Sequence, residues 1–215
     1  KAKLHANAAI KQQERRAIET ERHHNISKSI TDLLKVAPFA EPDHPYLQDK
    51  QIRSENLLQV PQDTNKLPDD SLIRIGKDWQ GSKQLREDYP DHIVLTAGDL
   101  LIPGQDVNNK TWTVQTINST GSKMFATGGK KESHFVVTGG LEGGVDALKD
   151  SPAIVIAEGY ATADTLSQVL NYPTVAAFDS GNLKSVAEQL RQKYPDKAII
   201  IAGDDDIKNE KNYRN

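Results

Sequence analysis

The last third of the chain alternates short apolar runs with amphipathic stretches. Apolar runs occupy residues 153–157, 174–178 and 198–202, and an acidic residue follows each run, directly or after one glycine. The stretches 161–170 and 183–194 lie between these runs and have the spacing of helices, and a proline comes soon after each of them. This alternation predicts a strand–helix–strand–helix–strand unit with a parallel sheet.

The middle of the chain has a different period. Residues 111–117 alternate between polar and apolar positions, and the segments 99–103, 123–126 and 133–137 are separated by turns rich in Gly and Asn. Period-two segments joined by such turns predict an antiparallel meander from about residue 93 onward. The proline-rich stretch before it gives no clear periodicity.

The first 36 residues contain neither Gly nor Pro and are rich in Ala, Gln, Glu, Lys and Arg, which predicts a helix. Residues 12–22 are charged on nearly all sides, so this part is expected to be a solvated arm or to pack on something outside the chain. The predicted fold class is α/β. The predicted domains are a helical arm (1–36), a mixed, β-rich subdomain (37–140) and an α/β domain (150–215).

Composition narrows the class of protein. With 36% hydrophobic and 27% charged residues, the chain resembles ordinary soluble proteins, and its apolar runs are far shorter than the roughly 20 residues of a membrane helix. The absence of cysteine excludes disulfides and thiolate-bound zinc, and fits a reducing, cytoplasmic compartment. A net charge of -3 means that any site for a polyanion must be a local patch. Because the chain begins at Lys1 without a Met, we expect a fragment of a longer protein.

The three apolar runs end in carboxylates. Glu158 follows the first run, Asp179 the second, and Asp204 and Asp206 follow the third. Since parallel strands end at one edge of a sheet, these acids would repel one another there unless a cation neutralised them. Oxygen ligands of this kind favour Mg²⁺ or Mn²⁺. Asp204 and Asp206 would point the same way, because side chains alternate along an extended chain.

Each acid also has a simpler interpretation. Glu158 could be a carboxylate favoured by the dipole of the following helix. Asp179 opens the sequence Asp-Ser-Gly-Asn, which is ordinary turn chemistry. Residues 204–206 could form a solvated acidic loop.

The acidic motifs resemble those of a known family. Residues 158–163 (Glu-Gly-Tyr-Ala-Thr-Ala) and 204–206 (Asp-Asp-Asp) resemble the two motifs of the Toprim domain, which primases, topoisomerases and some nucleases share. Residues 177–183 bring the resemblance closer to DNA primases of plasmids and phages, of the conjugative TraC-like type. Upstream, 44–47 (His-Pro-Tyr-Leu) and the β-rich segment 101–131 resemble the region before Toprim in those proteins.

The resemblance implies a DNA primase fragment that makes RNA primers on single-stranded DNA from NTPs, in plasmid or phage replication or conjugation, with a helicase or relaxase as a further candidate partner. Glu158, Asp204 and Asp206 would be catalytic and, with Asp179 as an auxiliary ligand, would hold Mg²⁺ or Mn²⁺. Glu158 could instead be a general base.

The sequence also departs from the family pattern. Thr162 stands where replicative primases carry an acid, Asp205 stands in place of a Gly, and the chain ends before the usual final helix and strand. A metal-dependent Toprim nuclease therefore remains an alternative. So does a non-catalytic nucleic-acid-binding module of a larger relaxase or helicase.

Basic residues supply candidate contacts to phosphates. Lysines beside a glycine loop can bind a template or a nucleotide, and solvated turns are the simpler interpretation. Trp112 could stack on a base or belong to the core, and neighbouring His23 and His24 could bind metal or be solvated. The candidate nucleic-acid or nucleotide contacts are Lys50, Arg53, Lys123, Lys130 and Lys131.

Overall fold

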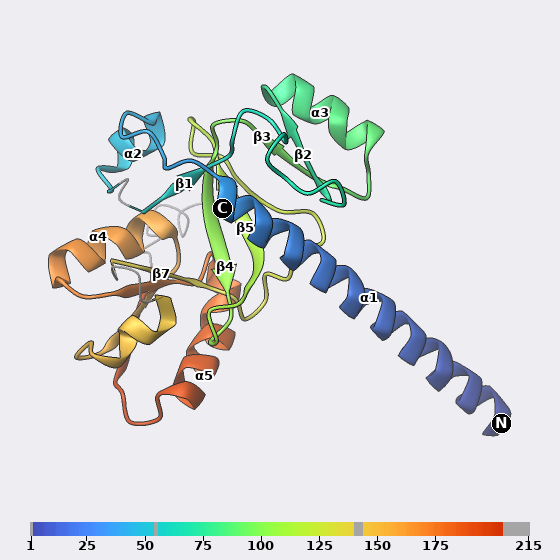
Figure 1. Ribbon diagram of the computed structural model, residues 1–215. Helices are drawn as coiled ribbons and strands as arrows, with labels where there is room; N and C mark the ends of the chain where they lie inside the picture. Colours follow the sequence, from blue (N-terminus) through green and yellow to red (C-terminus); the bar gives the residue numbers. More distant parts are fainter. Residues whose placement is uncertain (1, 54–55, 140–143, 204–215) are drawn as a thin grey trace, which may run out of the picture. The chain divides into compact units, whose positions relative to one another are not determined.

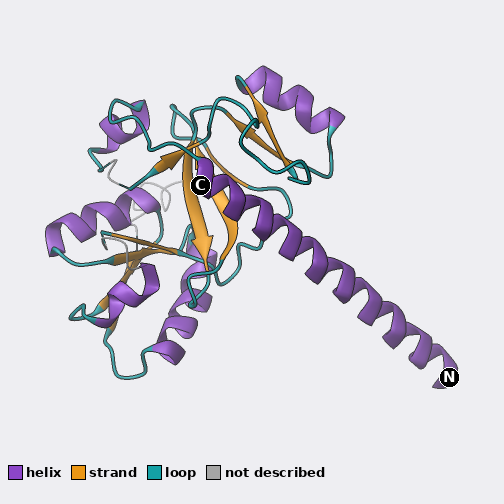
Figure 2. Cartoon of the chain, viewed as in Figure 1, coloured by secondary structure: helices purple, strands orange, loops and turns teal. Residues whose placement is uncertain are grey.

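The computed structural model describes residues 2–53, 56–139 and 144–203, with the side chains of the first helix described from residue 10. The chain forms two compact units (Figures 1 and 2). Unit 1 comprises 1–104 and 111–131, and unit 2 comprises 105–110 and 132–215. In the described part of the chain, no helix is long and apolar enough to cross a membrane.

Unit 1 begins with the helix α1 (Ala2–Val36), as the composition predicts. Its last turns bury Ile26, Ile30 and Leu33 in the core of the unit, where α1 packs against the strand β5 (Thr111–Ile117). The residues from 10 to 22 are exposed, and in Figure 1 this half of α1 extends away from the strands of its own unit. The predicted helical arm is therefore confirmed as a helix.

The main sheet of unit 1 has the strand order β1-β4-β5-β6. The pair β5–β6 is antiparallel, as the period-two pattern predicts. The pair β1–β4 is also antiparallel, and β1 comes from the stretch without clear periodicity. The short helix α2 (Pro45–Lys50) precedes this sheet in the chain. Besides β5, the strands of this sheet are β1 (Leu58–Gln59), β4 (Leu100–Gln105) and β6 (Lys123–Phe125).

A small β–α–β unit completes unit 1. Most of it lies in the stretch without clear periodicity, whereas residues 93–96, predicted to open the antiparallel meander, instead form a strand that is parallel to its partner. The β–α–β unit consists of β2 (Ile73–Gly76), α3 (Trp79–Asp88) and β3 (Ile93–Thr96), and its two strands are parallel. The turn from β2 into α3 is tight, because a Cβ at Gly76 would lie 2.4 Å from the backbone nitrogen of Ser82. Only glycine fits this turn without a shift of the helix.

Unit 2 contains the predicted parallel sheet, with strand order β10-β8-β9-β7. The strands β8, β9 and β10 are parallel neighbours, which confirms the prediction from the apolar runs. Helix α4 packs against β7, β8 and β9, and α5 packs against β8 and β10. The elements are β7 (Val136–Thr138), η1 (Gly144–Lys149), β8 (Ile154–Ala157), α4 (Tyr160–Leu170), β9 (Thr174–Ala176), η2 (Ser180–Asn182), α5 (Leu183–Lys193) and β10 (Ile199–Ala202).

Strand β7 differs from the prediction. The alternation at 133–137 predicted another strand of the meander, whereas β7 pairs antiparallel with β9 at the end of the unit 2 sheet. The alternation of polar and apolar residues in so short a segment predicts a strand, but it does not indicate the strand with which it pairs. Burial of Phe135, which is fully enclosed in the core of unit 2, favours the observed pairing.

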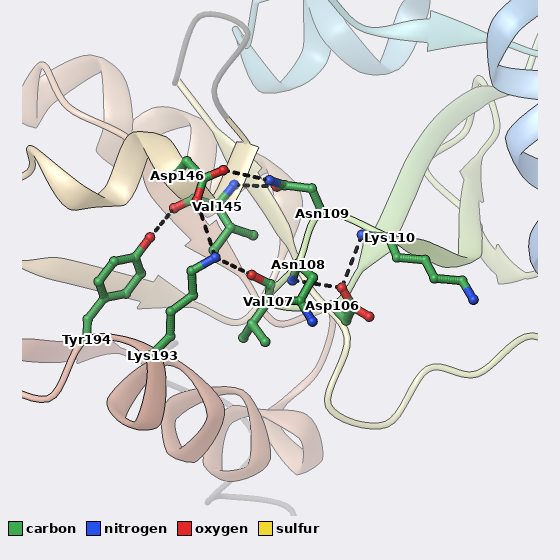
Figure 3. Close-up of polar contacts among 9 residues, drawn as sticks. All are labelled: Asp106, Val107, Asn108, Asn109, Lys110, Val145, Asp146, Lys193 and Tyr194. Atoms are coloured by element: carbon green, nitrogen blue, oxygen red, sulfur yellow. Dashed lines mark hydrogen bonds and ion pairs between the residues drawn. The ribbon is translucent and has the colours of Figure 1, made fainter.

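The turn after β4 belongs to unit 2 and is held there by polar contacts (Figure 3). Asn109 accepts a hydrogen bond from the backbone N–H of Val145 (2.8 Å) and donates one to Asp146 (3.1 Å). Lys193 Nζ lies 3.3 Å from Asp146, and the Tyr194 hydroxyl donates to the Val145 carbonyl at 2.9 Å. These contacts join the turn to η1 and to the end of α5.

Candidate active site

The acidic edge of unit 2 is built by strand register. In the parallel pairs, Ala157 at the end of β8 is aligned with Ala202 of β10 and with Ala176 of β9. Glu158 therefore follows the central strand of the three and lies at the edge where both neighbours end. Its side chain is partly exposed, so it can reach a ligand outside the carboxyl ends of the strands.

The chain turns directly from Glu158 into α4. Gly159 is the N-cap in an extended conformation (φ −106°), and no side chain caps this helix start. The first N–H groups of a helix favour anions, because they lack partners within the helix and carry the positive end of its dipole. The edge thus combines a carboxylate with a helix start that suits phosphate.

Asp179 stands at the neighbouring strand end and has a turn role. Its Oδ1 accepts a hydrogen bond from the backbone N–H of Asn182 at 3.1 Å. The residue before it, Phe178, has a φ of +76°, an uncommon conformation for a bulky side chain. Asp179 therefore has the turn role that its sequence context indicates. Its role as a metal ligand stays a prediction.

The other two predicted metal ligands, Asp204 and Asp206, lie outside the described residues. Within residues 2–53, 56–139 and 144–203, no group of three or more His, Cys, Asp or Glu side chains could hold a metal ion. Strand β10 ends at Ala202 beside Ala157, so the register leads the chain toward Glu158 before the acidic triplet begins. The described part of the predicted metal set is Glu158 and Asp179.

A buried acid that the sequence reading missed lies on α4. Asp164 is only 3% exposed and accepts hydrogen bonds from Thr138 Oγ1 (2.8 Å) and Gln168 Nε2 (2.7 Å). It therefore ties α4 to the end of β7, which is an edge strand of the sheet. Buried positions of an amphipathic helix are usually apolar. An acid at such a position in the sequence could therefore have indicated a buried, hydrogen-bonded side chain.

Asn182 is the second residue that the sequence did not single out for this role. Asn182 directly precedes α5, and its side chain does not cap the backbone N–H groups of that helix, although its Oδ1 accepts a hydrogen bond from the Ser185 hydroxyl (2.9 Å). The same Oδ1 accepts from the N–H of Ser133 (2.7 Å), and the Nδ2 donates to the carbonyls of His134 and Ala177 (2.8 Å each). These bonds fix the end of β9 and the Asp179 turn that follows.

Two of the predicted basic residues meet in unit 1. Lys50, at the end of α2, and Lys123, at the start of β6, line one pocket of about 490 Å³. Lys50 Nζ lies 3.0 Å from Asp49, and this hydrogen bond raises the pKa of Lys50. The buried Tyr46 forms part of the wall. The lining residues are Pro45, Tyr46, Asp49, Lys50, Ser119, Thr120, Gly121 and Lys123.

The other predicted lysines lie over aromatic rings in the same unit. Lys130 Nζ is 5.4 Å from the centroid of the Trp112 ring, and Lys131 Nζ is 5.6 Å from that of Phe125. The ring of His24 packs against Trp112 at 5.4 Å. Trp112 is partly buried, so it is neither a core residue nor a fully open stacking platform. Arg53 lies just after α2 and is also partly buried.

Comparison with solved structures defines the class of fold. The DnaG primase catalytic domain bound to ssDNA matches with a TM-score of 0.51 and 15% identity, over 86% of this chain and 62% of that chain. The catalytic core of the E. coli primase matches with a TM-score of 0.50 and 15% identity, over 89% and 65%. The RNA polymerase domain of Mycobacterium tuberculosis primase DnaG, in complex with double-stranded DNA, matches with 0.51 and 12%, over 89% and 67%. The chain thus has the α/β fold of a primase catalytic core, as predicted.

Sequence comparison gives the nearer relationship. The chain is 40% identical over 208 residues to an Escherichia coli protein named DNA primase TraC, covering 96% of this chain and 16% of that protein. A second E. coli protein of the same name is 37% identical over 211 residues, covering 96% and 12%. The chain is therefore homologous to a segment of TraC-type DNA primases and spans less than a fifth of their length. No family model matches it.

Proposed function

We propose that this chain is the catalytic segment of a DNA primase, which joins NTPs into short RNA primers on a single-stranded DNA template. The observation that carries the proposal is the position of Glu158, at the end of the central strand of three parallel neighbours, in a fold of the primase catalytic-core class. The homology to TraC primases supports the same activity.

The acidic edge would be a Toprim-type site for Mg²⁺ or Mn²⁺. Glu158, Asp204 and Asp206 would be its ligands, with Asp179 as an auxiliary one, and their carboxylate oxygens suit these ions. A bound divalent ion would supply charge neutralisation for the triphosphate and activation of the primer 3′-hydroxyl. Glu158 would orient that hydroxyl at the strand end, and the uncapped start of α4 would favour an adjacent phosphate.

The basic residues of unit 1 would bind the polyanions. Lys50 and Lys123 share a polar pocket whose volume is in the range of small-ligand sites, so we assign them to the phosphates of an NTP or of the template. Lys130, Lys131 and Arg53 would add contacts to the template backbone. Contacts of this kind position the nucleic acid without reading its sequence.

We further propose a cellular context for this activity. The chain would act in the cytoplasm, in replication or conjugation of a plasmid or phage, with a helicase or relaxase as a candidate partner.

The test is incorporation of labelled NTPs on a single-stranded template with Mg²⁺ or Mn²⁺. We expect primers from the unmodified chain and none above background from Glu158→Gln. The matched control is Glu188→Gln, since Glu188 is an exposed glutamate of the same unit whose side chain is 62% exposed, and it should keep full activity. Degradation of labelled DNA without NTPs would indicate a nuclease instead. DNA binding without either reaction, unchanged in Asp204→Asn, would indicate a binding module.

A further inference from the structure

Helix α3 carries an exposed tryptophan in an unusual setting. Trp79, the first residue of this helix, is 57% exposed. Tryptophan is enriched at binding interfaces because its ring offers a large apolar surface with one polar group, so Trp79 is a candidate contact for a ligand. The guanidinium carbon of Arg86 lies 5.0 Å from the centroid of the Trp79 ring.

The neighbours of Trp79 on the helix surface are cations. Positions 79, 83 and 86 are spaced i, i+4 and i+7, so Trp79, Lys83 and Arg86 lie along one side of α3. Of the nearby acids, Asp78 accepts a hydrogen bond from the N–H of Gly81 (2.8 Å) and Asp88 accepts one from Gln84 (3.0 Å). Glu87 is exposed next to the stripe, and Arg86 interacts electrostatically with Asp99. The stripe itself carries an aromatic ring and two cationic side chains.

The helix that carries the stripe is firmly placed in unit 1. Ser82 is fully buried, and its hydroxyl lies 3.2 Å from the Leu95 carbonyl and 2.8 Å from Thr96 Oγ1. The turn at Gly76 holds the start of α3 against β2. A ring on a fixed helix, already stacked by Arg86, loses little freedom when a ligand binds.

We propose that Trp79, Lys83 and Arg86 form a stacking site for single-stranded nucleic acid. A base would stack on the indole, and the adjacent phosphates would contact Lys83 and Arg86. The site shares no residue with the acidic edge or with the Lys50–Lys123 pocket. It rests on the proposed function only for the choice of a single strand as the ligand.

The chain contains two tryptophans, Trp79 and Trp112, which allows a direct test. In Trp112→Phe, all indole fluorescence comes from Trp79. Titration with oligo(dT) in EDTA and without NTPs should quench this emission to a saturating limit, because a stacked base quenches the indole. Emission that stays constant while fluorescence anisotropy of a labelled oligonucleotide reports binding would overturn the proposal.

Affinity variants give an independent readout. Trp79→Ala should weaken oligo(dT) binding about tenfold, and Trp79→Phe should keep most of the affinity, since phenylalanine also stacks. Removal of the charges in Lys83→Gln and in Arg86→Gln should each reduce the slope of log K against log salt by about 0.7. The control is Phe39→Ala, because Phe39 is 68% exposed in the same unit and should not matter. Equal affinities of Trp79→Ala and the unmodified chain would contradict the site.

These experiments separate the two proposals. Quenching of Trp79 without any NTP incorporation would leave the stacking site in place and contradict the primase activity. NTP incorporation that depends on Glu158, with no effect of Trp79→Ala on DNA binding, would support the primase activity and contradict the stacking site.

Discussion

The two units assemble their candidate functional residues in different ways. In unit 2, Glu158 directly follows β8 and Asp179 comes three residues after the end of β9, so the register of the parallel pair brings both acids to one edge of the sheet. In unit 1 the cations come from separate elements, as with Lys50 of α2 and Lys123 of β6, and meet only because those elements pack around one pocket. Backbone topology therefore fixes the acidic edge, whereas side-chain packing forms the basic surfaces.

The strongest test of this contrast is Glu158→Gln. Loss of one carboxylate from the strand edge should lower the rate of NTP incorporation by a factor of about 10² to 10⁴, with no loss of folding stability, because the residue is partly exposed. Single-turnover incorporation and urea unfolding would measure the two quantities. A rate within threefold of the unmodified chain would contradict the role of the edge.

Asn182 tests whether the edge needs its supporting hydrogen bonds. Asn182→Ala removes bonds to Ser133, His134 and Ala177 from a buried position, which should lower the free energy of unfolding by about 2–4 kcal/mol. Urea unfolding would measure it, with Asn108→Ala as the control at an exposed asparagine. An effect below 0.5 kcal/mol would show that the turn holds without these bonds.

The lysine pocket should respond to salt, unlike the acidic edge. Lys50→Gln and Lys123→Gln should each raise the KM for NTP or the Kd for template about tenfold at low ionic strength, and less at high salt, because both lysines act through phosphate charge. Steady-state kinetics at two salt concentrations would measure this. Lys184→Gln, at an exposed lysine of α5, is the control, and a fall in kcat with unchanged KM would argue against a phosphate role.

Asp99 gives the smallest effect and concerns unit 1. Burial raises its pKa from 3.8 to about 6. Because the folded chain then holds a proton that the unfolded chain releases, stability is greatest below pH 4 for this group and falls as the pH rises to 6. The loss should be about 1–2 kcal/mol after allowance for solvent screening. Unfolding midpoints from pH 4 to 7 should show it, and Asp99→Asn should remove it.

The sequence predicted the parts of the molecule that depend on local pattern. Apolar runs separated by helical stretches were enough to place β8, β9 and β10 in one parallel sheet, and therefore to bring Glu158 and Asp179 to neighbouring strand ends. The long first helix followed from composition alone. In each case the prediction needs only the sequence of the helix or strand concerned and of its immediate neighbours.

The remaining parts depend on contacts between distant segments. The partner of β7 was predicted wrongly because three residues carry no information about the strand beside them. The β–α–β unit was missed because its strands have four residues each and are separated by a polar helix. Asp164 and Asn182 act through buried hydrogen bonds to Thr138 and Ser133, and no spacing in the sequence indicates such partners.

The most direct measurement is Mn²⁺ binding at the acidic edge, by anomalous diffraction from crystals of the chain soaked in Mn²⁺. We expect an anomalous peak within coordination distance of the Glu158 carboxylate, and no such peak in crystals of Glu158→Gln. An edge that stays empty at millimolar Mn²⁺, with or without a bound nucleotide, would contradict a catalytic metal site in this segment.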